Sequence, residues 1–517
     1  MLAALRSAEL DVLVVGGGIT GAGIARDAAL RGLATALVEA VDFAAGTSSR
    51  SSKLIHGGVR YLAQGDVGLV REAAAERLVL KRIAPHLAVP VTMVIPTYAR
   101  TTHLKLGAGL WAFEKLVTVD EADRHRLLDR REALAFEPTL APERLFGAAV
   151  YGEYLTDDAR LVLENVRDAH LAGALCANHA EVTALERGAA VVRDTLDGSE
   201  LRVRARVIVN AAGPWVSEVE RRAGVRGGLR LQLTKGVHLV VARERLPLRH
   251  VVVMAARDKR SVFAVPRDDV VYLGTTDTVY DAAVLNPGVT RDDVAYLLDA
   301  ANRVFTGPPL TEGDLIGSWA GLRPLLHQEG KAPSEISRRD ETRIDEALAL
   351  ISIAGGKLTA YRTMAERVVD LVCTRLGRPA LACRTAELPL PSARGTLPTP
   401  ADLASVLPGL PAVAAERLRR LYGAEALHVV RRAAALGGVD ALWRAEIERA
   451  VEAEMALTLE DALERRLRLL LFDAGQGLAV AEEAAALMAQ RLGWNRERTA
   501  RELADYRQLA ACARTFT

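Results

Sequence analysis

Three glycines near the start of the chain have a spacing that allows a tight turn followed by a helix. Gly16, Gly18 and Gly21 fit the pattern G-x-G-x-x-G. In such a turn the first glycine permits the sharp bend, the second lets the backbone approach a pyrophosphate, and the third lets the helix pack closely on a sheet. Unsatisfied N–H groups at the helix start then face the phosphates. We therefore expect a dinucleotide to contact Gly16, Gly18, Ile19, Thr20 and Gly21, with a purely structural turn as the alternative.

The residues on both sides of this turn supply the elements that it needs. Residues 11–15 predict a short buried strand, residues 19–31 a helix, and residues 34–39 a second strand. Glu39 ends that strand, where a carboxylate can accept hydrogen bonds from an adenosine ribose. Glu39 also disfavours a 2′-phosphate, because two anions would repel each other.

A hydroxyl-rich stretch at 46–58 bears on which dinucleotide is bound. Its short donors can wrap an extended second part of a cofactor, as in FAD, which a nicotinamide fold does not need. A Ser-rich loop without a ligand is the alternative. The residues that we assign to the cofactor here are Thr47, Ser48, Ser52, Lys53, Leu54, His56 and Gly57.

Two later stretches can also approach a cofactor. Residues 207–215 form an apolar strand that ends in small residues, where a cofactor can pass close to the backbone. Residues 353–359 combine a strand, a glycine turn and a helix start, whose dipole can stabilise negative charge on a reduced flavin. An ordinary tight turn is the alternative for each. The residues assigned to the cofactor are Gly213, Trp215, Gly356, Lys357, Leu358 and Thr359.

Length and composition limit the remaining possibilities. The 517 residues suffice for about two to four domains. A net charge of +2 argues against a nucleic-acid partner. Four widely separated cysteines, without C-x-x-C, argue against an iron–sulfur cluster or a zinc ribbon and favour a reducing cytoplasm. We expect no bound metal, no signal peptide and no membrane-spanning helix.

Further elements can be predicted along the chain. Helices are expected at 69–84, 158–172 and 359–376, strands at 89–95 and 205–210, and a hairpin at 262–274. Clustered prolines between Pro389 and Pro411 predict a linker or a domain boundary. From residue 412 onward the chain lacks strand signals and predicts a helical domain.

Together these stretches resemble the FAD-dependent glycerol-3-phosphate dehydrogenases. The specific matches are TSSRSSKLIHGGVRYL (47–62) and AGGKLTAYRTMAE (354–366), whereas the glycine motif VVGGGITGAGIARDAALRG (14–32) is less specific. The other matches are NAAGPW (210–215), TKGVHLVV (234–241), LGTTDT (273–278), AGLRPL (320–325), AEIERAVEAEMALTLEDALERRLRL (445–469) and LGWNRER (492–498). The resemblance covers nearly the whole chain.

The resemblance implies a fold that combines α/β with α+β architecture. A glutathione-reductase-like Rossmann FAD domain would comprise residues 1–92, 160–234 and 345–385. A D-amino-acid-oxidase-like substrate domain would comprise residues 93–159 and 235–344. An all-α C-terminal cap domain would comprise residues 386–517.

The resemblance also implies a reaction. Members of the family oxidise sn-glycerol 3-phosphate to dihydroxyacetone phosphate by hydride transfer to FAD. Cations must hold the phosphate, and arginine suits a two-point grip whereas lysine acts as a point charge. The residues implied for the substrate are Arg60, Tyr61, Thr276, Arg323, Lys357 and Arg362, of which Arg323 and Lys357 are also implied in catalysis.

A group must also accept the proton of the substrate hydroxyl. His238 is our candidate, because an imidazole suits that role near pH 7. Lys235 or a water polarised by arginine is the alternative, and His56 is expected to contact the flavin. Val237 stands where the family usually has serine and Ala360 where it usually has threonine, so hydrogen bonds near the substrate or flavin can differ.

The electron acceptor is predicted by comparing branches of the family. The sequence lacks the extra C-terminal cysteines of a cluster-dependent branch, the long insertion of an oxygen-using branch and the calcium-binding loops of the mitochondrial branch. What remains resembles the compact bacterial respiratory form, which is peripheral on the inner face of the cytoplasmic membrane and passes electrons to a membrane quinone. The resemblance also implies a homodimer.

Residues 103–116 are the candidate membrane contact. Apolar and aromatic side chains stand there beside Lys105 and Lys115, which suits anionic headgroups. A buried helix with a solvated basic face is the alternative. The cations that can add attraction are Arg100, Arg124, Arg126, Arg130 and Arg131.

Two rival functions remain. A flavin amine or amino-acid oxidase of the same fold would bind a carboxylate and need fewer cations. A non-catalytic flavin-binding scaffold would keep the glycine turn and Glu39, but it would not need Arg60, Arg323 and Lys357 together.

Overall fold

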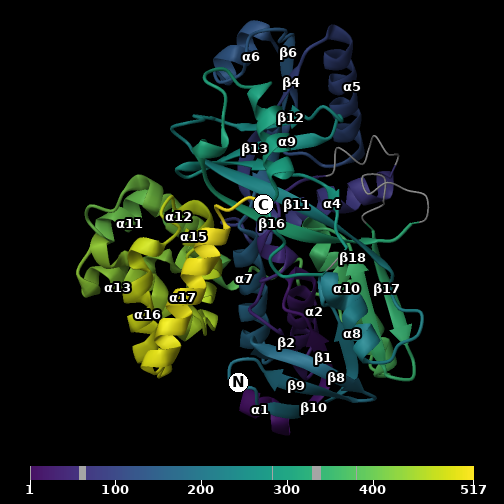
Figure 1. Ribbon diagram of the computed structural model, residues 1–517. Helices are drawn as coiled ribbons and strands as arrows, with labels where there is room; N and C mark the ends of the chain where they lie inside the picture. Colours follow the sequence, from purple (N-terminus) through teal and green to yellow (C-terminus); the bar gives the residue numbers. More distant parts are fainter. Residues whose placement is uncertain (1, 58–65, 282, 329–338, 380) are drawn as a thin grey trace.

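The molecule consists of two β-sheets with their covering helices and a helical domain at one side. It is described by a computed structural model that covers residues 2–57, 66–281, 283–328, 339–379 and 381–517. Figure 1 shows the first sheet at the end that holds the N-terminus, the second sheet toward the other end, and the C-terminal helices beside them. Within the covered ranges, no helix is both long and apolar enough to cross a membrane.

The first sheet carries the glycine motif. In the described residues it has eight strands, and along the path β17-β18-β10-β1-β2-β7 every neighbouring pair except β17 and β18 is parallel. Helices cover such a sheet, so its central strands are buried and apolar. The strands are β1 (Glu9–Val15), β2 (Thr35–Val38), β7 (Leu175–Ala177), β8 (Ala180–Glu186), β9 (Ala189–Asp194), β10 (Glu200–Asn210), β17 (Asp340–Asp345) and β18 (Leu350–Gly355).

Four helices contribute to one apolar core with this sheet: α2 (Ile19–Leu30), α4 (Val67–Ile83), α7 (Asp158–Leu171) and α10 (Tyr361–Arg375). The predicted strand–helix–strand start and the helix at 158–172 are confirmed. The Asp157 carboxylate caps α7 by accepting the Arg160 backbone N–H. Before α10, residues Leu358–Ala360 form a 3₁₀ turn, so this helix begins two residues later than predicted.

The second sheet is mostly antiparallel and has ten strands in the described residues. The predicted hairpin at 262–274 is confirmed as β13 and β14. The longest pairing joins β11 to β16. The strands are β3 (Leu54–Ile55), β4 (Val89–Thr97), β5 (Arg126–Asp129), β6 (Gly147–Leu155), β11 (Leu231–Ala242), β12 (Val251–Ala255), β13 (Ser261–Arg267), β14 (Val270–Gly274), β15 (Thr278–Val279) and β16 (Leu315–Leu326).

The sheets cut across the predicted domain boundaries by a few residues. Strand β4 spans the boundary at 92/93, β11 spans that at 234/235, and β17 spans that at 344/345. Strand β3 pairs with β6 of the second sheet, although residues 1–92 were assigned to the FAD domain. Segment 47–55 therefore bridges the two sheets.

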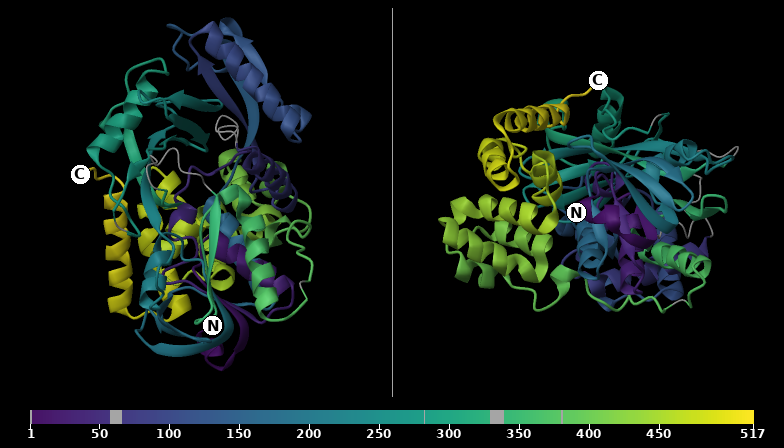
Figure 2. Two further views of the ribbon diagram at one scale, coloured as in Figure 1. Left: turned by 90° about the vertical axis from the view of Figure 1, so that its right-hand side faces the viewer. Right: turned by 90° about the horizontal axis from the view of Figure 1, so that it is seen from below.

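The other helices pack on one of the two sheets or form the C-terminal domain. Figure 2 shows α5 and its neighbouring strands reaching farthest from the N-terminus. The remaining helices are α1 (Leu2–Ser7), α5 (Arg100–Leu116), α6 (Arg130–Phe136), α8 (Val216–Arg222), α9 (Arg291–Asn302), α11 (Pro400–Val406), α12 (Ala412–Tyr422), α13 (Ala426–Leu436), α14 (Leu442–Glu454), α15 (Leu469–Phe472), α16 (Leu478–Leu492) and α17 (Arg496–Cys512).

The proline-rich segment 389–411 is packed, which excludes a free linker and leaves the alternative, a domain boundary. Leu390 lies in the core of the first sheet, and Leu403 and Leu410 lie in a core of the C-terminal domain. Pro400 begins α11, a position that tolerates proline because its missing N–H would have no helical partner. The buried leucines between the prolines drive this packing.

The C-terminal domain is joined to the rest by an apolar core and by buried charges. Its helices share one core with the second sheet. A single π-helical turn at Asp461–Arg466 is buried at the junction. There the Arg465 Nε donates to Asp42 at 2.6 Å, and the Arg466 Nη2 donates to the same carboxylate at 2.8 Å.

Candidate active site

The glycine turn has the backbone that a close approach to phosphate requires. Gly16 has a φ of +107°, and a Cβ there would lie 2.6 Å from the Ala211 carbonyl oxygen. A Cβ on Gly21 would lie 1.9 Å from the Gly16 carbonyl oxygen, so only glycine allows α2 to begin this close to the turn. These contacts support the predicted role of the turn at the N-terminus of α2.

Two side chains converge on the same turn. The Glu39 carboxylate accepts the Gly17 N–H at 2.7 Å and the Val41 N–H at 2.9 Å, and burial raises its pKa. The Ser48 hydroxyl accepts the Ile19 N–H at 3.0 Å and thus reaches the first turn of α2. The turn, the end of β2 and the hydroxyl-rich stretch therefore form one site, which fits an adenosine ribose and a pyrophosphate.

Segment 47–53 crosses from this turn to the second sheet. The Thr47 hydroxyl donates to the Leu322 carbonyl oxygen at 2.6 Å, and the Ser52 hydroxyl lies 2.9 Å from His238 Nε2. The Lys53 ammonium was assigned to the cofactor, but it points away, into a buried pair with Asp158 at 2.9 Å. Burial lowers the pKa of Lys53 to about 8, against the favourable charge of Asp158.

Other residues assigned to the cofactor lie on strand ends and turns. Leu54 is in β3, and His56 follows it. The Gly57 N–H donates to the buried Glu153 carboxylate, 3.0 Å from each oxygen. Gly213 has a φ of +56°, and the Trp215 indole N–H donates to Ala283. Around α10, Gly356 has a φ of +83°, Lys357 precedes the 3₁₀ turn, and Leu358 and Thr359 form it.

One face of the second sheet presents the candidate base and a candidate phosphate ligand. In the register of β11 and β16, His238 is opposite Trp319, Gly236 is opposite Gly321, and Thr234 is opposite Arg323. These positions alternate by two, so all of their side chains lie on one face. Between His238 and Arg323 the two strands therefore carry only glycines on this face. The Arg323 guanidinium covers Gly236, and Arg50 covers Gly321.

His238 is buried in an aromatic setting. Its ring stacks on Trp319 with the centroids 4.8 Å apart, and the edge of Tyr272 is nearby. A Cβ on Gly274, its partner across β14, would lie 2.0 Å from the ring, so that glycine makes room for it. Burial, and then the charges of Arg323 and Lys53, lower the pKa of His238 well below 6.5. The imidazole is therefore neutral at physiological pH.

Arg323 is held at the edge of the same face. Its guanidinium donates to the Thr275 hydroxyl at 2.9 Å and to the Thr276 carbonyl oxygen at 3.2 Å, and it pairs with Asp277 at 3.3 Å. A Cβ on Gly236 would lie 2.3 Å from the guanidinium. The Thr276 hydroxyl is turned toward β11, where it accepts the Val237 N–H at 3.0 Å.

The structure does not bring all predicted site residues to this face. Arg362 is buried in an ion pair with Glu76, with Nη2 2.7 Å from the carboxylate, so its charge is engaged in holding α10 to α4. Lys235, the alternative base, is buried against Asp293 at 2.7 Å, which argues against that role. Arg60 and Tyr61 lie outside the described residues.

Several residues around the site were missed by sequence reasoning. Trp319 stacks on His238, yet it lies one residue before the matching stretch 320–325. Asp158 and Glu153 fix Lys53 and the Gly57 peptide, and they lie about 100 residues from them in sequence. The sequence indicates Asp158 and Glu153 only as polar residues at the start of a helix and near the end of a buried strand.

Comparisons with known proteins identify the family of this chain. Residues 11–347 match the family described as FAD dependent oxidoreductase, and residues 383–499 match the C-terminal domain of alpha-glycerophosphate oxidase. An aerobic glycerol-3-phosphate dehydrogenase of Bacillus subtilis (strain 168) is 39% identical over 521 residues, covering 96% of this chain and 94% of that protein. One of Staphylococcus aureus (strain USA300) is 44% identical over 381 residues, covering 72% and 68%.

Solved structures point the same way. The glycerol-3-phosphate dehydrogenase from Bacillus halodurans, complexed with FAD, superposes with a TM-score of 0.83 at 35% identity, covering 99% of this chain and 97% of that one. L-alpha-glycerophosphate oxidase from Mycoplasma pneumoniae has a TM-score of 0.57 at 19% identity and covers 71% of this chain, which shows the fold alone.

A glycine turn on a parallel sheet, beside an antiparallel sheet that presents a histidine and an arginine, defines a dinucleotide-dependent oxidoreductase. Its cofactor is FAD, as the hydroxyl-rich stretch predicts. The chain belongs to the family of FAD-dependent aerobic glycerol-3-phosphate dehydrogenases. The predicted fold class is confirmed with it.

Proposed function

We propose that this protein oxidises sn-glycerol 3-phosphate to dihydroxyacetone phosphate and passes the electrons to a membrane quinone. The observation that carries the proposal is the β11–β16 face, on which a neutral histidine and an arginine lie two register positions apart with only glycines between them. A small phosphorylated alcohol needs that combination of a proton acceptor and a cation. The relatives named above carry the corresponding activity in their names.

Each residue of this face has a distinct role in the proposal. The Arg323 guanidinium grips the phosphate, and Lys357 adds a second positive charge by family resemblance. His238 accepts the proton from the C2 hydroxyl at Nδ1, which has no hydrogen-bond partner among the described residues. The Ser52 hydroxyl holds the ring through Nε2. FAD, when bound, supplies the two-electron acceptor for the hydride.

The substrate half-reaction provides the test. Purified yellow protein is mixed anaerobically with glycerol 3-phosphate in a stopped-flow spectrophotometer, and the visible flavin band is followed. We expect bleaching with glycerol 3-phosphate and none with glycerol or D-alanine. Bleaching by D-alanine alone would favour the amino-acid oxidase, and bleaching by none of the three would favour the scaffold. Reoxidation by a soluble quinone analogue then tests the acceptor.

Replacing His238 with glutamine is expected to slow flavin reduction by about 10²- to 10⁴-fold, the usual contribution of a positioned base. A lowered pKa means that the neutral, proton-accepting form persists below pH 6.5 and is lost only as the pH falls further. The wild-type rate at saturating substrate should therefore not fall between pH 8 and pH 6.5. The measurement is the limiting rate of bleaching against pH.

His103→Gln is the matched control for this variant. His103 is also a buried histidine of the second-sheet region, and its Nδ1 lies 2.9 Å from the Thr97 hydroxyl, remote from the β11–β16 face. Its bleaching rate should equal that of wild type. A His238→Gln rate within about threefold of this control would remove His238 as the base.

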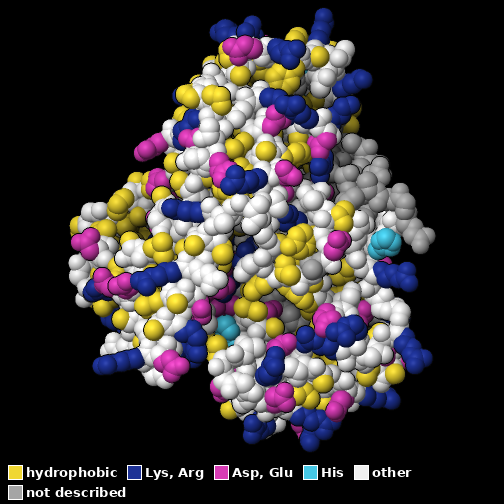
Figure 3. Space-filling view, viewed as in Figure 1, with side chains coloured by type: hydrophobic (Ala, Val, Ile, Leu, Met, Phe, Trp, Pro, Cys, Tyr) yellow, Lys and Arg dark blue, Asp and Glu magenta, His cyan; other side chains and the backbone are white. Residues whose placement is uncertain are grey.

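The proposed contact with the membrane lies at the end of the molecule that carries α5. Leu104 and Trp111 on α5 are 54% and 57% exposed, so the predicted segment 103–116 is not a fully buried helix. Figure 3 shows lysines and arginines around apolar side chains at this end. Exposed apolar rings beside cations suit the headgroup region of an anionic bilayer.

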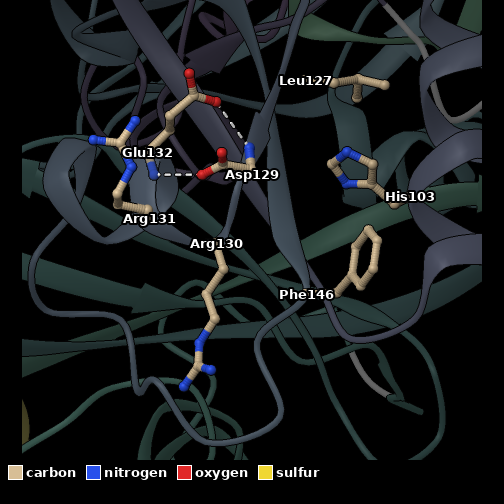
Figure 4. A pocket seen from close by; sticks show the side chains of 7 residues that line it. All are labelled: His103, Leu127, Asp129, Arg130, Arg131, Glu132 and Phe146. Carbon is tan, nitrogen blue, oxygen red and sulfur yellow. Dashed lines mark hydrogen bonds between the residues drawn. The ribbon is translucent and has the colours of Figure 1, made fainter.

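A hollow of about 650 Å³ lies beside this helix. His103, Leu127 and Phe146 lie together on one side of it, and Asp129 and Glu132, which bond to each other's backbone N–H in a helix cap, lie on the other (Figure 4). Arg130 and Arg131 also line it. The hollow therefore adds apolar surface to the same end.

Reversing Lys105 and Lys115 to glutamate is expected to weaken binding to anionic vesicles. Each basic residue near such a surface contributes about 1 kcal/mol, so the loss should be at least roughly 30-fold. Co-sedimentation with phosphatidylglycerol vesicles measures it. The control is Arg187→Glu with Arg204→Glu, both exposed at the opposite end near β8 and β10 (Figure 1). Equal binding by both double variants would place the contact elsewhere.

The homodimer implied by the family resemblance stays part of this proposal. Sedimentation equilibrium of the detergent-free protein measures the assembly mass directly. A mass of about twice 55.6 kDa is expected, and a monomer mass would contradict it.

A further inference from the structure

The C-terminal domain reaches the flavin site through charged residues that the proposed chemistry does not use. Figure 1 shows α15 beside β16, and the π-helical turn that precedes α15 contacts α7. Both β16 and α7 border segment 47–53. The π-helical turn at Asp461–Arg466 and the residues just after it lie at this junction. Three separate contacts run from there to segment 47–53 and to the His238 ring.

The first contact is an ion pair with the segment itself. The Arg50 Nη2 donates to the Glu464 carboxylate at 3.0 Å, and both side chains are buried. The other oxygen of Glu464 accepts from Arg465 at 2.6 Å. The backbone of Arg50 lies over Gly321, where a Cβ would be 3.0 Å from the Arg50 carbonyl oxygen. The ion pair with Glu464 therefore holds segment 47–53 against the face of the second sheet that carries His238.

The second contact is shared through two buried carboxylates. Arg468 donates to Asp157 at 3.1 Å and to Asp158 at 3.3 Å. Asp158 in turn holds the Lys53 ammonium, and it accepts the Ser51 hydroxyl at 2.7 Å. Asp157 and Asp158 can be buried at the start of α7 only because three cations neutralise them. These cations are Lys53, Arg267 and Arg468.

The third contact is aromatic. The Phe472 ring lies 6.0 Å from the Trp319 ring in an edge-on arrangement, and Trp319 stacks on His238. The Tyr272 hydroxyl donates to the Ser52 carbonyl oxygen at 3.0 Å, which connects this aromatic cluster to segment 47–53. Ser52 is the residue whose hydroxyl contacts His238 Nε2.

We propose that the C-terminal domain completes the flavin site, with Glu464 and Arg468 as positioning residues that hold segment 47–53 between the glycine turn and His238. Ser48 and Ser52 lie near the two ends of segment 47–53. The Ser48 hydroxyl contacts the start of α2, and the Ser52 hydroxyl contacts His238. A loss of either anchor lets both hydroxyls move. FAD affinity then falls, and proton transfer in the proposed reaction slows.

The test measures FAD binding, which needs no substrate. Apoprotein of wild type, Glu464→Gln and Arg50→Met is titrated with FAD by flavin fluorescence, together with the double variant. We expect each single variant to weaken FAD binding by about 10-fold or more, because a buried charge loses its partner. The double variant should be no weaker than the worse single variant, since both changes remove one interaction.

Glu446→Gln is the matched control. Glu446 is equally buried in the same domain, and it accepts from Arg417 and Tyr422 within that domain. Its FAD affinity should equal that of wild type even if its melting temperature falls as far as that of Glu464→Gln. When Glu446→Gln is combined with Arg50→Met, the changes in the free energy of FAD binding should be additive.

Two outcomes would overturn the proposal. One is an FAD affinity of Glu464→Gln that matches Glu446→Gln, and the other is additivity of Arg50→Met and Glu464→Gln. If Glu464→Gln does not fold, Arg468→Lys replaces it, since lysine keeps the charge but cannot bridge both carboxylates. Turnover of glycerol 3-phosphate rests on the proposed function, whereas FAD affinity does not, so the two failures are distinguishable.

Discussion

Gly21→Ala protein is expected to purify without its yellow colour. The new Cβ would lie 1.9 Å from the Gly16 carbonyl oxygen, and neither backbone can move without opening the turn that faces the pyrophosphate. Overpacking of this kind costs about 3 kcal/mol, which corresponds to a roughly 100-fold loss of FAD affinity. The ratio of flavin to protein absorbance in the purified protein measures it.

Gly109→Ala is the control for this variant. Gly109 also lies within a helix, α5, and a Cβ there would meet no atom within 4 Å. Alanine favours a helix over glycine by about 1 kcal/mol, so this variant should keep its flavin and melt no lower than wild type. A fully yellow Gly21→Ala protein would show that the turn does not bind the cofactor.

The second large effect is expected for Arg323→Met. Methionine keeps most of the side-chain volume but removes the guanidinium that we assign to the phosphate. A charge-assisted hydrogen bond contributes about 1.5–3 kcal/mol, so kcat/KM for glycerol 3-phosphate should fall by roughly 10- to 200-fold, while the flavin stays bound. The kcat/KM of Arg323→Lys should lie between those of wild type and Arg323→Met, because lysine keeps the positive charge but lacks the two-point hydrogen bonding of a guanidinium.

Arg245→Met is a suitable control for that effect. Arg245 lies just beyond β11 in the same region and pairs with Asp314 at 2.7 Å, so its replacement also removes one arginine–aspartate pair. Its kcat/KM should be that of wild type. An Arg323→Met enzyme with unchanged kcat/KM would place phosphate recognition on other cations.

The parts of the site that sequence reasoning predicted are those whose physical cause is local. The turn at 16–21 needs glycines because of contacts within a few residues, and Glu39 follows from the length of the strand before it. The hairpin at 262–274 likewise depends on alternation and a short polar turn. Such features leave a spacing that can be recognised without a structure.

The parts that were missed depend on partners far away in the sequence. Lys53 and Arg362 look like ligands in their motifs, yet each is committed to a buried carboxylate that no spacing indicates, Asp158 and Glu76 respectively. Segment 389–411 looks like a linker because its prolines are visible, whereas the burial of Leu403 depends on helices that follow it. In these cases contacts with residues far away in the sequence, and not the local sequence pattern, determine where the side chains lie.

The buried pairing of Asp42 has a consequence for synthesis. Arg465 lies 423 residues beyond Asp42, so on a ribosome that adds about 5–20 residues per second Asp42 is made roughly 20 to 85 seconds before its arginine partner. During that time the first sheet cannot bury Asp42 without a large electrostatic penalty. We therefore expect Asp42 to stay hydrated until the C-terminal domain has been made.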